Sequence, residues 1–320
     1  MENIKVASVQ FEHKNGDKVY NINKIEEFVQ QACKNDVDMI VFPECCITGY
    51  WYLRKLSKED LMALSENMSD SKSVQLIVKM SKKYNITICT GLIENHKDNL
   101  YNTYIVVMPD GTVKYHRKLH CFVNEHMSSG NEYTVIDTPF GWKVGILICY
   151  DNNIIENTRI TALMGADVII APHQTGGCRT SDQNIMGIID SALWENRIKD
   201  PISIEKEFKG EKGRGWLLRW LPSRAHDNGV FYVFSNGVGK DDDEIRTGNA
   251  MIIDAYGRII TETWKAADDM VIAKLDASLL NDNTGQRWIT ARRPSLYKSL
   301  TKLTGKELDM FTARFSGKGA

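Results

Sequence analysis

The chain has 320 residues, and its 40 Lys and Arg residues nearly balance 41 Asp and Glu residues, which leaves a net charge of −1. Because nucleic-acid binders normally carry a basic excess, this balance argues against a nucleic-acid partner, and no apolar run approaches the ~18 residues of a membrane-spanning helix. The start of the chain lacks the pattern of a secretory signal, and 7 cysteines are too few for a disulfide scaffold, so we expect a cytoplasmic protein with reduced thiols.

Short apolar segments alternate with amphipathic segments along the chain. Residues 4–11 alternate with the period of a strand, residues 22–32 repeat apolar side chains at helical spacing, and residues 39–42 are typical of a buried strand. Further elements follow in the same manner. Strands are predicted at residues 86–92, 103–108, 112–116, 143–148, 167–171, 231–235, 250–254 and 271–275, and a helix near residues 154–164. This interleaving predicts a layered α/β fold.

No linker, repeat or low-complexity segment divides the chain, so we expect a single domain over residues 1–280. Within it, residues 176–220 have weaker periodicity and several glycines, which predicts an elaborated surface segment or a lid. Residues 281–320 are expected to be a C-terminal extension used in subunit contacts. The acidic run at residues 241–244 is interpreted as a solvated loop rather than a cation site.

Three polar residues follow directly on predicted strands: Glu44, Lys118 and Cys149. Taken singly, each has a simpler explanation, since a Glu after a strand commonly starts a helix and a buried Cys commonly acts as a small apolar residue. Because α/β folds usually form their sites at one edge of a sheet, a carboxylate, an amine and a thiol could meet there. Their combination in this chain order favours a catalytic site.

The motifs around these residues resemble those of the nitrilase superfamily of carbon–nitrogen hydrolases. They are FPE at residues 42–44, HRKLH at 116–120 and LICYD at 147–151. The resemblance begins with VASVQ at residues 6–10 and covers nearly the whole chain. It implies a four-layer α-β-β-α sandwich that associates with further copies of the chain as a homodimer or a higher homo-oligomer.

The resemblance also implies a catalytic triad formed by Glu44, Lys118 and Cys149. A second glutamate often serves such sites, and Glu125 stands where it would be expected after the lysine. Its implied role is to hold Lys118 or the substrate nitrogen rather than to attack. Neither a metal nor an organic cofactor is required by this chemistry.

Amide and nitrile carbons are poor electrophiles, so the reaction needs a strong nucleophile. A thiolate is strong, but a free Cys is mostly protonated near neutral pH. We therefore expect Glu44 to take the proton of Cys149, return it to the leaving nitrogen and later activate water against the thioester. Lys118 and the backbone N–H of Tyr150 are expected to stabilise the oxyanion, and one such donor typically lowers the barrier by ~3–4 kcal/mol.

Four residues are candidates for binding the substrate. Tyr50 and Trp51 follow the glutamate motif and could either line the pocket or belong to the core. His173 follows a predicted strand and could face the site from its end. Arg179 could bind a substrate carboxylate, as the carbamoyl-amino-acid hydrolases of the family require, or lie on the surface.

Hydrolysis of a small amide or N-carbamoyl compound is the reaction that we expect first, because Tyr150-Asp151 after the cysteine resembles the amidase branches of the family. Nitrile hydrolysis is the alternative, since the interval from Lys118 to Glu125 and residues 137–141 are nitrilase-like. From a different class of function, a catalytically silent binding relative also stays open. The ligand expected for the enzyme is a small molecule.

Overall fold

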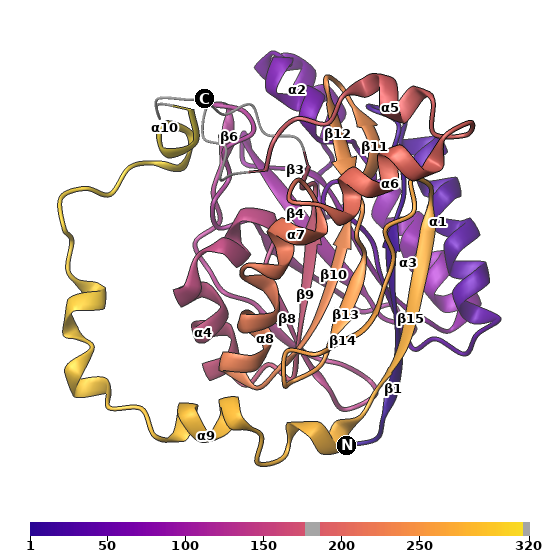
Figure 1. Cartoon of the computed structure of the whole chain (residues 1–320). Coiled ribbons are helices and arrows are strands. Elements are labelled where there is room, and N and C mark those ends of the chain that lie inside the picture. Colours follow the sequence, from indigo (N-terminus) through magenta and orange to yellow (C-terminus); the bar gives the residue numbers. More distant parts are fainter. Residues whose placement is uncertain (177–185, 316–320) are drawn as a thin grey trace.

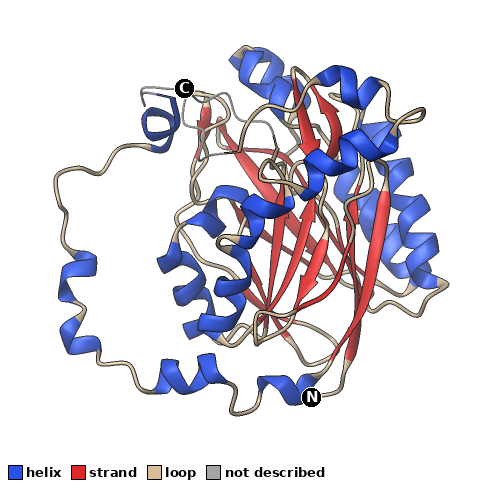
Figure 2. Cartoon of the chain, viewed as in Figure 1, coloured by secondary structure: helices blue, strands red, loops and turns tan. Residues whose placement is uncertain are grey.

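Two β-sheets pack face to face between two layers of helices in the computed structural model, which describes residues 1–176 and 186–315 (Figure 1, Figure 2). The first sheet has the order β15–β1–β2–β3–β4–β5, with β6 beside β4. Its strands are β15 (Asp269–Leu275), β1 (Ile4–Gln10), β2 (Met39–Val41), β3 (Thr87–His96), β4 (Asn99–Val107), β5 (Val113–Arg117) and β6 (Met127–Ser128).

The second sheet has the order β14–β13–β10–β9–β8–β7. Its strands are β14 (Ile259–Glu262), β13 (Met251–Ile253), β10 (Phe231–Asn236), β9 (Val168–His173), β8 (Lys143–Ile146) and β7 (Val135–Asp137). In each sheet the central strands are parallel: β1, β2 and β3 in the first, and β8, β9 and β10 in the second. The carboxyl ends of such strands share one edge of the sheet, which is where α/β folds place their sites.

Strand alternation sorts the apolar side chains into layers. Val6 of β1 faces the second sheet, whereas its neighbour Ala7 faces the helices on the outside. Buried hydroxyls also join the two sheets, because Ser8 Oγ donates to the carbonyl of Phe234 at 2.5 Å and Ser235 Oγ donates to that of Val9 at 2.6 Å. The central strands β1 and β10 are therefore fixed against each other through the middle of the molecule.

Helices cover the outer face of each sheet and complete a four-layer α-β-β-α sandwich (Figure 2). Helices α1 (Lys18–Cys33) and α3 (Lys72–Tyr84) cover the first sheet, and α4 (Ile155–Leu163) and α8 (Leu221–Asn228) cover the second. The Asp17 side chain accepts the N–H of Tyr20 and so caps the start of α1. Outside these layers lie α2 (Lys58–Leu64) and the 3-10 helices η1 (Trp51–Lys55), η2 (Cys149–Asn153), η3 (Ala277–Leu280), η4 (Pro294–Leu296) and η5 (Lys298–Thr301).

The described part of the predicted surface segment 176–220 is a small helical layer. It holds α5 (Ser191–Glu195) and α6 (Pro201–Lys209), which lie over a hairpin of β11 (Val238–Asp241) and β12 (Glu244–Thr247) (Figure 1). It also holds α7 (Arg214–Leu218), whose Leu217 packs with Leu221 of α8 on the outer face of the second sheet. Trp194 of α5 and Phe208 of α6 pack with Ile245 of β12 in a cluster of their own. The segment is therefore attached through an apolar core to the hairpin.

The interpretation of the acidic run at residues 241–244 as a solvated loop is wrong for its two ends, whereas Asp242 and Asp243 form the hairpin turn and are half-buried and exposed, respectively. Asp241 and Glu244 are only 1% and 4% exposed, at the ends of the two hairpin strands. The sequence pattern missed the cations that make this burial tolerable. Arg246 pairs with Asp241 at 3.2 Å and with Glu244 at 3.1 Å, and Arg54 pairs with Asp242 at 2.6 Å.

After η3 the chain forms α9 (Thr284–Thr290), whose Trp288 ring lies 5.3 Å from that of His226 on α8. Beyond α9 it leaves the sandwich as a long arm and returns at its end with α10 (Met310–Phe315) (Figure 1). Met310 packs against the apolar cluster that contains Phe122 and against which Tyr150 also packs. Within the described residues, no helix of the chain has the length and apolar character needed to cross a membrane.

Candidate active site

The residues Glu44 and Lys118 meet at one edge of the first sheet. Glu44 follows β2 and Lys118 follows β5, and these strands run in the same direction because β4 is antiparallel to both β3 and β5. Lys118 Nζ donates to Glu44 Oε1 at 2.6 Å. Both side chains are buried, with 1% of the lysine and none of the glutamate exposed.

The Glu44 carboxylate is held by more than the lysine. Asn102 of β4 donates its Nδ2 to the same Oε1 at 2.6 Å, and Gln174 donates to the Glu44 carbonyl at 2.8 Å. Burial alone would lower the pKa of Lys118, but the adjacent Glu44 carboxylate raises it, and the net pKa lies well above its usual value. Lys118 is therefore a fixed cation. Oε2 of Glu44 is buried and accepts no hydrogen bond from the described residues, so it is left for a further proton donor.

Cys149 follows β8 and begins η2 at a sharp turn. Its φ of 49° lies in the left-handed region, which non-glycine residues rarely adopt and which clusters at functional sites. Burial raises the pKa of the Cys149 thiol to about 11, with a further increase from Glu44 and an opposing effect of Lys118. The resting side chain is therefore a thiol that needs a base, and the two groups that act on its charge are the buried pair described above.

Asp151 ties the cysteine turn to the lysine strand. Its carboxylate is fully buried and accepts the backbone N–H groups of Ile148 at 3.1 Å, Leu119 at 3.2 Å and His120 at 2.9 Å. The ring nitrogen Nδ1 of His120 lies 2.9 Å from the same carboxylate. Burial raises the pKa of Asp151, but its histidine neighbours outweigh this effect and lower the pKa below the usual range. One ionised carboxylate thus fixes the residues that adjoin Lys118 and Cys149.

His173 lies behind the cysteine at the end of β9. Its Nε2 is 3.1 Å from Asn152 Nδ2, and its Nδ1 is 2.8 Å from Thr175 Oγ1. Thr175 Oγ1 is in turn 3.9 Å from Cys149 Sγ. Burial and then the Lys118 charge lower the pKa of His173 well below its usual value, so the imidazole is neutral. The structure therefore places His173 next to residues that contact the cysteine, at one remove from the thiol.

Tyr50 and Trp51 are both buried in one apolar cluster, but they have different neighbours. The Tyr50 ring centroid is 5.4 Å from Lys118 Nζ, which puts this tyrosine beside the buried pair. Trp51 instead donates its indole N–H to Asp243 at 3.1 Å, and its ring lies 4.6 Å from the Arg54 guanidinium. Trp51 thus anchors η1 to the β11–β12 hairpin.

Glu125 does not lie beside Lys118, and this prediction needs correction. Its side chain is exposed in the turn before β6, while Lys118 Nζ is bonded to Glu44. The turn directs the preceding residue inward instead, since Asn124 is buried and donates Nδ2 to the carbonyls of Leu53 and Leu56 at 2.8 and 3.0 Å. The position of Glu125 along the chain was a poor guide to its direction in space.

Tyr150 and Arg179 are the remaining residues that the sequence predicts for the site. Tyr150 directly follows the cysteine and is half-buried, with its ring 5.7 Å from that of Phe122. Arg179 lies outside the described residues. The motifs did not reveal several other contributors to the site. Asp151 stood in the motif LICYD at residues 147–151 but was given no role, and the others are Asn102, Asn152, Gln174 and Thr175.

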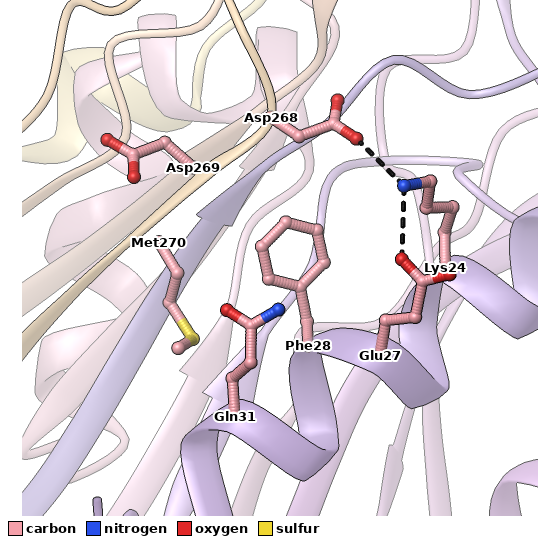
Figure 3. A pocket seen from close by; sticks show the side chains of 7 residues that line it. All are labelled: Lys24, Glu27, Phe28, Gln31, Asp268, Asp269 and Met270. Atoms are coloured by element: carbon pink, nitrogen blue, oxygen red, sulfur yellow. Dashed lines mark hydrogen bonds and ion pairs between the residues drawn. The ribbon is translucent and has the colours of Figure 1, made fainter.

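A separate pocket lies on the surface between α1 and β15 (Figure 3). It is lined by Lys24, Glu27, Phe28, Gln31, Asp268, Asp269 and Met270. Lys24 already pairs with Glu27 at 3.0 Å and with Asp268 at 3.4 Å. None of the residues that line this pocket is a nucleophile of the kind found at the sheet edge.

Comparison with known proteins agrees with this geometry. The family model described as carbon-nitrogen hydrolase matches residues 5–282. An (R)-stereoselective amidase from Pseudomonas sp. is 26% identical over 82% of this chain and 81% of its own, and a nitrilase from Pyrococcus abyssi is 24% identical over 87% and 92%. The crystal structure of Saccharomyces cerevisiae Nit3, a member of branch 10 of the nitrilase superfamily, superposes with a TM-score of 0.68 at 24% identity, over 96% of this chain and 97% of that one, and shares the sandwich fold. The chain therefore belongs to the carbon–nitrogen hydrolase family and is an enzyme that hydrolyses carbon–nitrogen bonds.

Proposed function

We propose that the enzyme cleaves the C–N bond of a small amide or N-carbamoyl compound through a thioester on Cys149. The observation that carries this proposal is the buried Glu44–Lys118 pair, whose charges both act on the thiol of a strained cysteine turn. A carboxylate, a cation and a thiol in one buried site can supply a base, an oxyanion partner and a nucleophile. No further group is needed for acyl transfer.

The reaction begins as Sγ of Cys149 attacks the substrate carbonyl carbon and Glu44 takes the thiol proton. A thiol with a pKa of about 11 needs this transfer at the moment of attack. The carbonyl oxygen becomes negative in the tetrahedral intermediate, where Lys118 and the Tyr150 N–H stabilise it. Glu44 then gives the proton to the nitrogen, the C–N bond breaks, and ammonia or an amine leaves.

The second half of the reaction regenerates the enzyme. Water attacks the thioester carbon while Glu44 accepts a proton from it, and the same two donors stabilise the second oxyanion. The C–S bond breaks, the acid leaves and the thiol takes its proton back. Lys118 stays a cation because Glu44 holds its charge in the resting enzyme and the oxyanion does so while Glu44 carries the proton. Only 1% of the lysine side chain is exposed to water.

Ammonia release across a matched panel of substrates tests the proposal. The panel contains primary amides, N-carbamoyl compounds, ω-amides and nitriles. We expect release from amides or carbamoyl compounds and its loss in Cys149→Ala, Glu44→Gln and Lys118→Ala proteins that remain folded. The matched control is Cys33→Ala, because Cys33 is an exposed thiol on α1 and should tolerate the change.

Other outcomes lead to different conclusions. Release from nitriles alone would replace the amide reaction by nitrile hydrolysis, the activity for which the Pyrococcus abyssi relative is named. Absence of ammonia release from every substrate of the panel would favour a binding protein that has the fold but does not turn over a substrate. Full activity of Cys149→Ala would overturn the mechanism.

We also propose that the chain forms a homodimer or a higher homo-oligomer through its C-terminal arm at residues 281–320. Leu296, Leu300 and Leu303 on this arm are 60%, 65% and 87% exposed, and such a row of apolar side chains is costly in water. Light scattering coupled to gel filtration should give a multimer for the full chain and a smaller species after removal of residues 292–309. A reducing compartment such as the cytoplasm is the proposed setting, because Cys149 must stay a free thiol.

A further inference from the structure

Arg246 of β12 is a buried cation that the reaction described above does not use. Only 3% of it is exposed. Its Nε donates to Asp241 at 3.2 Å, and its Nη1 donates to the Gly176 carbonyl at 2.6 Å and lies 3.1 Å from Glu244. The remaining nitrogen, Nη2, is buried and has no hydrogen-bond partner among the described residues. A guanidinium carries five N–H donors, so two of them are left for another group.

Tyr50, which lies near Lys118, also has a buried polar atom without a hydrogen-bond partner. Its hydroxyl is buried and has no hydrogen-bond partner within the described part of the chain. The centroid of its ring is 5.4 Å from Lys118 Nζ and 5.8 Å from the Arg246 Cζ. The tyrosine ring is therefore near both the lysine of the proposed triad and the buried arginine. Each unsatisfied buried polar group costs about 1–3 kcal/mol, which a bound substrate atom would offset.

The charges around Arg246 decide what kind of atom fits. Burial raises the pKa of Asp241, but His13, Arg246 and a backbone N–H outweigh it and lower the pKa to about 2, so this carboxylate is ionised and offsets the arginine. Burial raises the pKa of Glu244 to about 7, with Arg246 and Arg314 opposing the rise and Asp243 adding to it. Near neutral pH the arginine thus faces one full and one partial negative charge. A second anion on Nη2 would be repelled by them.

We propose that Arg246 Nη2 and Tyr50 Oη bind an uncharged oxygen, a carbonyl or a hydroxyl, at the end of the substrate remote from the scissile C–N bond. The proposal deepens the proposed function and rests on it, since it places the reacting carbonyl at Lys118 and Cys149. The substrate is then a short bifunctional molecule whose far end is neutral and accepts hydrogen bonds. The site selects a neutral far end because the carboxylates of Asp241 and Glu244 already offset the charge of the guanidinium.

Three substrates of equal length test the proposal: glutaramide, glutaramic acid and pentanamide. Their far ends are a neutral amide, a carboxylate and a methyl group. Wild-type kcat/KM should be highest for glutaramide. Tyr50→Phe removes one hydroxyl and keeps the ring beside Lys118, and Arg246→Lys keeps the charge between Asp241 and Glu244. Each should lower kcat/KM for glutaramide about ten- to a hundredfold, with a change of less than about threefold for pentanamide.

The control is Tyr52→Phe. Tyr52 is half-buried and donates its hydroxyl to the Thr48 carbonyl at 2.9 Å, so it matches the chemical change without adjoining Lys118. It should leave the ratio of the two kcat/KM values unchanged. Equal losses on glutaramide and pentanamide, or a wild-type preference for glutaramic acid, would overturn the proposal.

A binding measurement separates this proposal from the proposed function. Calorimetry with Cys149→Ala protein reports Kd without turnover, and Tyr50→Phe in that background should weaken glutaramide about tenfold or more but not pentanamide. Absence of this difference contradicts the Arg246–Tyr50 site even if all amides are hydrolysed. Absence of ammonia release by the wild type, with the Kd difference present, contradicts the proposed reaction instead.

Discussion

Replacing Asp151 with Asn should damage stability and catalysis together, because this carboxylate joins the residues next to Lys118 and Cys149. One carboxylate oxygen accepts from the Leu119 and Ile148 N–H groups, and the other accepts from His120. An amide keeps only one acceptor oxygen, so its NH₂ group faces either the two N–H groups of Leu119 and Ile148 or the single backbone N–H of His120. At about 1.5–3 kcal/mol for each hydrogen bond to a charged group, the free energy of unfolding should fall by roughly 1.5–6 kcal/mol.

The loss of activity should exceed what unfolding explains. When the residues beside Lys118 and Cys149 are no longer held by the carboxylate, the Lys118 ammonium, which is proposed to stabilise the oxyanion, shifts relative to the thiol. Displacements on the order of 1 Å can lower the rate ~100-fold. Urea unfolding gives the stability, and kcat for a small amide is measured where the variant is folded. Asp254→Asn is the control, because Asp254 is also a buried carboxylate that accepts backbone N–H groups, those of Tyr256 and Arg258, on the β13–β14 turn. A folded Asp151→Asn protein with wild-type kcat would refute this reasoning.

Three further predictions concern single groups. Glu66→Gln should lower the free energy of unfolding by about 1–2 kcal/mol at pH 7 and not at all near pH 2. Burial raises the pKa of Glu66, but Lys18 and neighbouring hydroxyl and N–H groups outweigh this effect and hold the pKa at about 2, below its unfolded value of ~4.3. The stabilisation by Glu66 is therefore present above pH ~4.3 and disappears as the pH falls, which unfolding curves at several pH values check. Alkylation of Cys149 by iodoacetamide should accelerate up to about pH 11, whereas a plateau near pH 7 would reveal a preformed thiolate. Gly176→Ala should lower kcat/KM at least about tenfold, because φ is 144° at this residue and a Cβ would lie 2.8 Å from the Arg246 Cα. Gly141→Ala is the control, since Gly141 also has a positive φ but a Cβ there would meet only open space. Equal effects of the two substitutions on kcat/KM would contradict the prediction.

Alternation and periodicity predicted the layered α/β fold and the strand-end positions of Glu44, Lys118 and Cys149, because these patterns act locally. The four-layer sandwich was implied by the resemblance to the nitrilase superfamily. Direction within a turn was harder to predict. Glu125 and Asn124 are neighbours in an irregular segment, and only the hydrogen bonds of Asn124 to the distant η1 decide which one turns inward.

Contacts between distant residues were equally hidden. Asn102 reaches Glu44 across 58 residues of chain, and Asp151 reaches the Leu119 N–H across 32. The acidic run at residues 241–244 was misjudged for the same reason. A local count of charges shows carboxylates, whereas the burial of Asp241 depends on Arg246 of the next strand and on its pairing with β12.

Mass analysis of the enzyme quenched in acid during turnover of a small amide tests the thioester mechanism most directly. The account predicts that the peptide containing Cys149 gains the mass of the substrate minus ammonia, that the adduct disappears when substrate is exhausted, and that Cys33 and the other thiols stay unmodified. Steady turnover with an unmodified Cys149, or an acyl group on another residue, would contradict it.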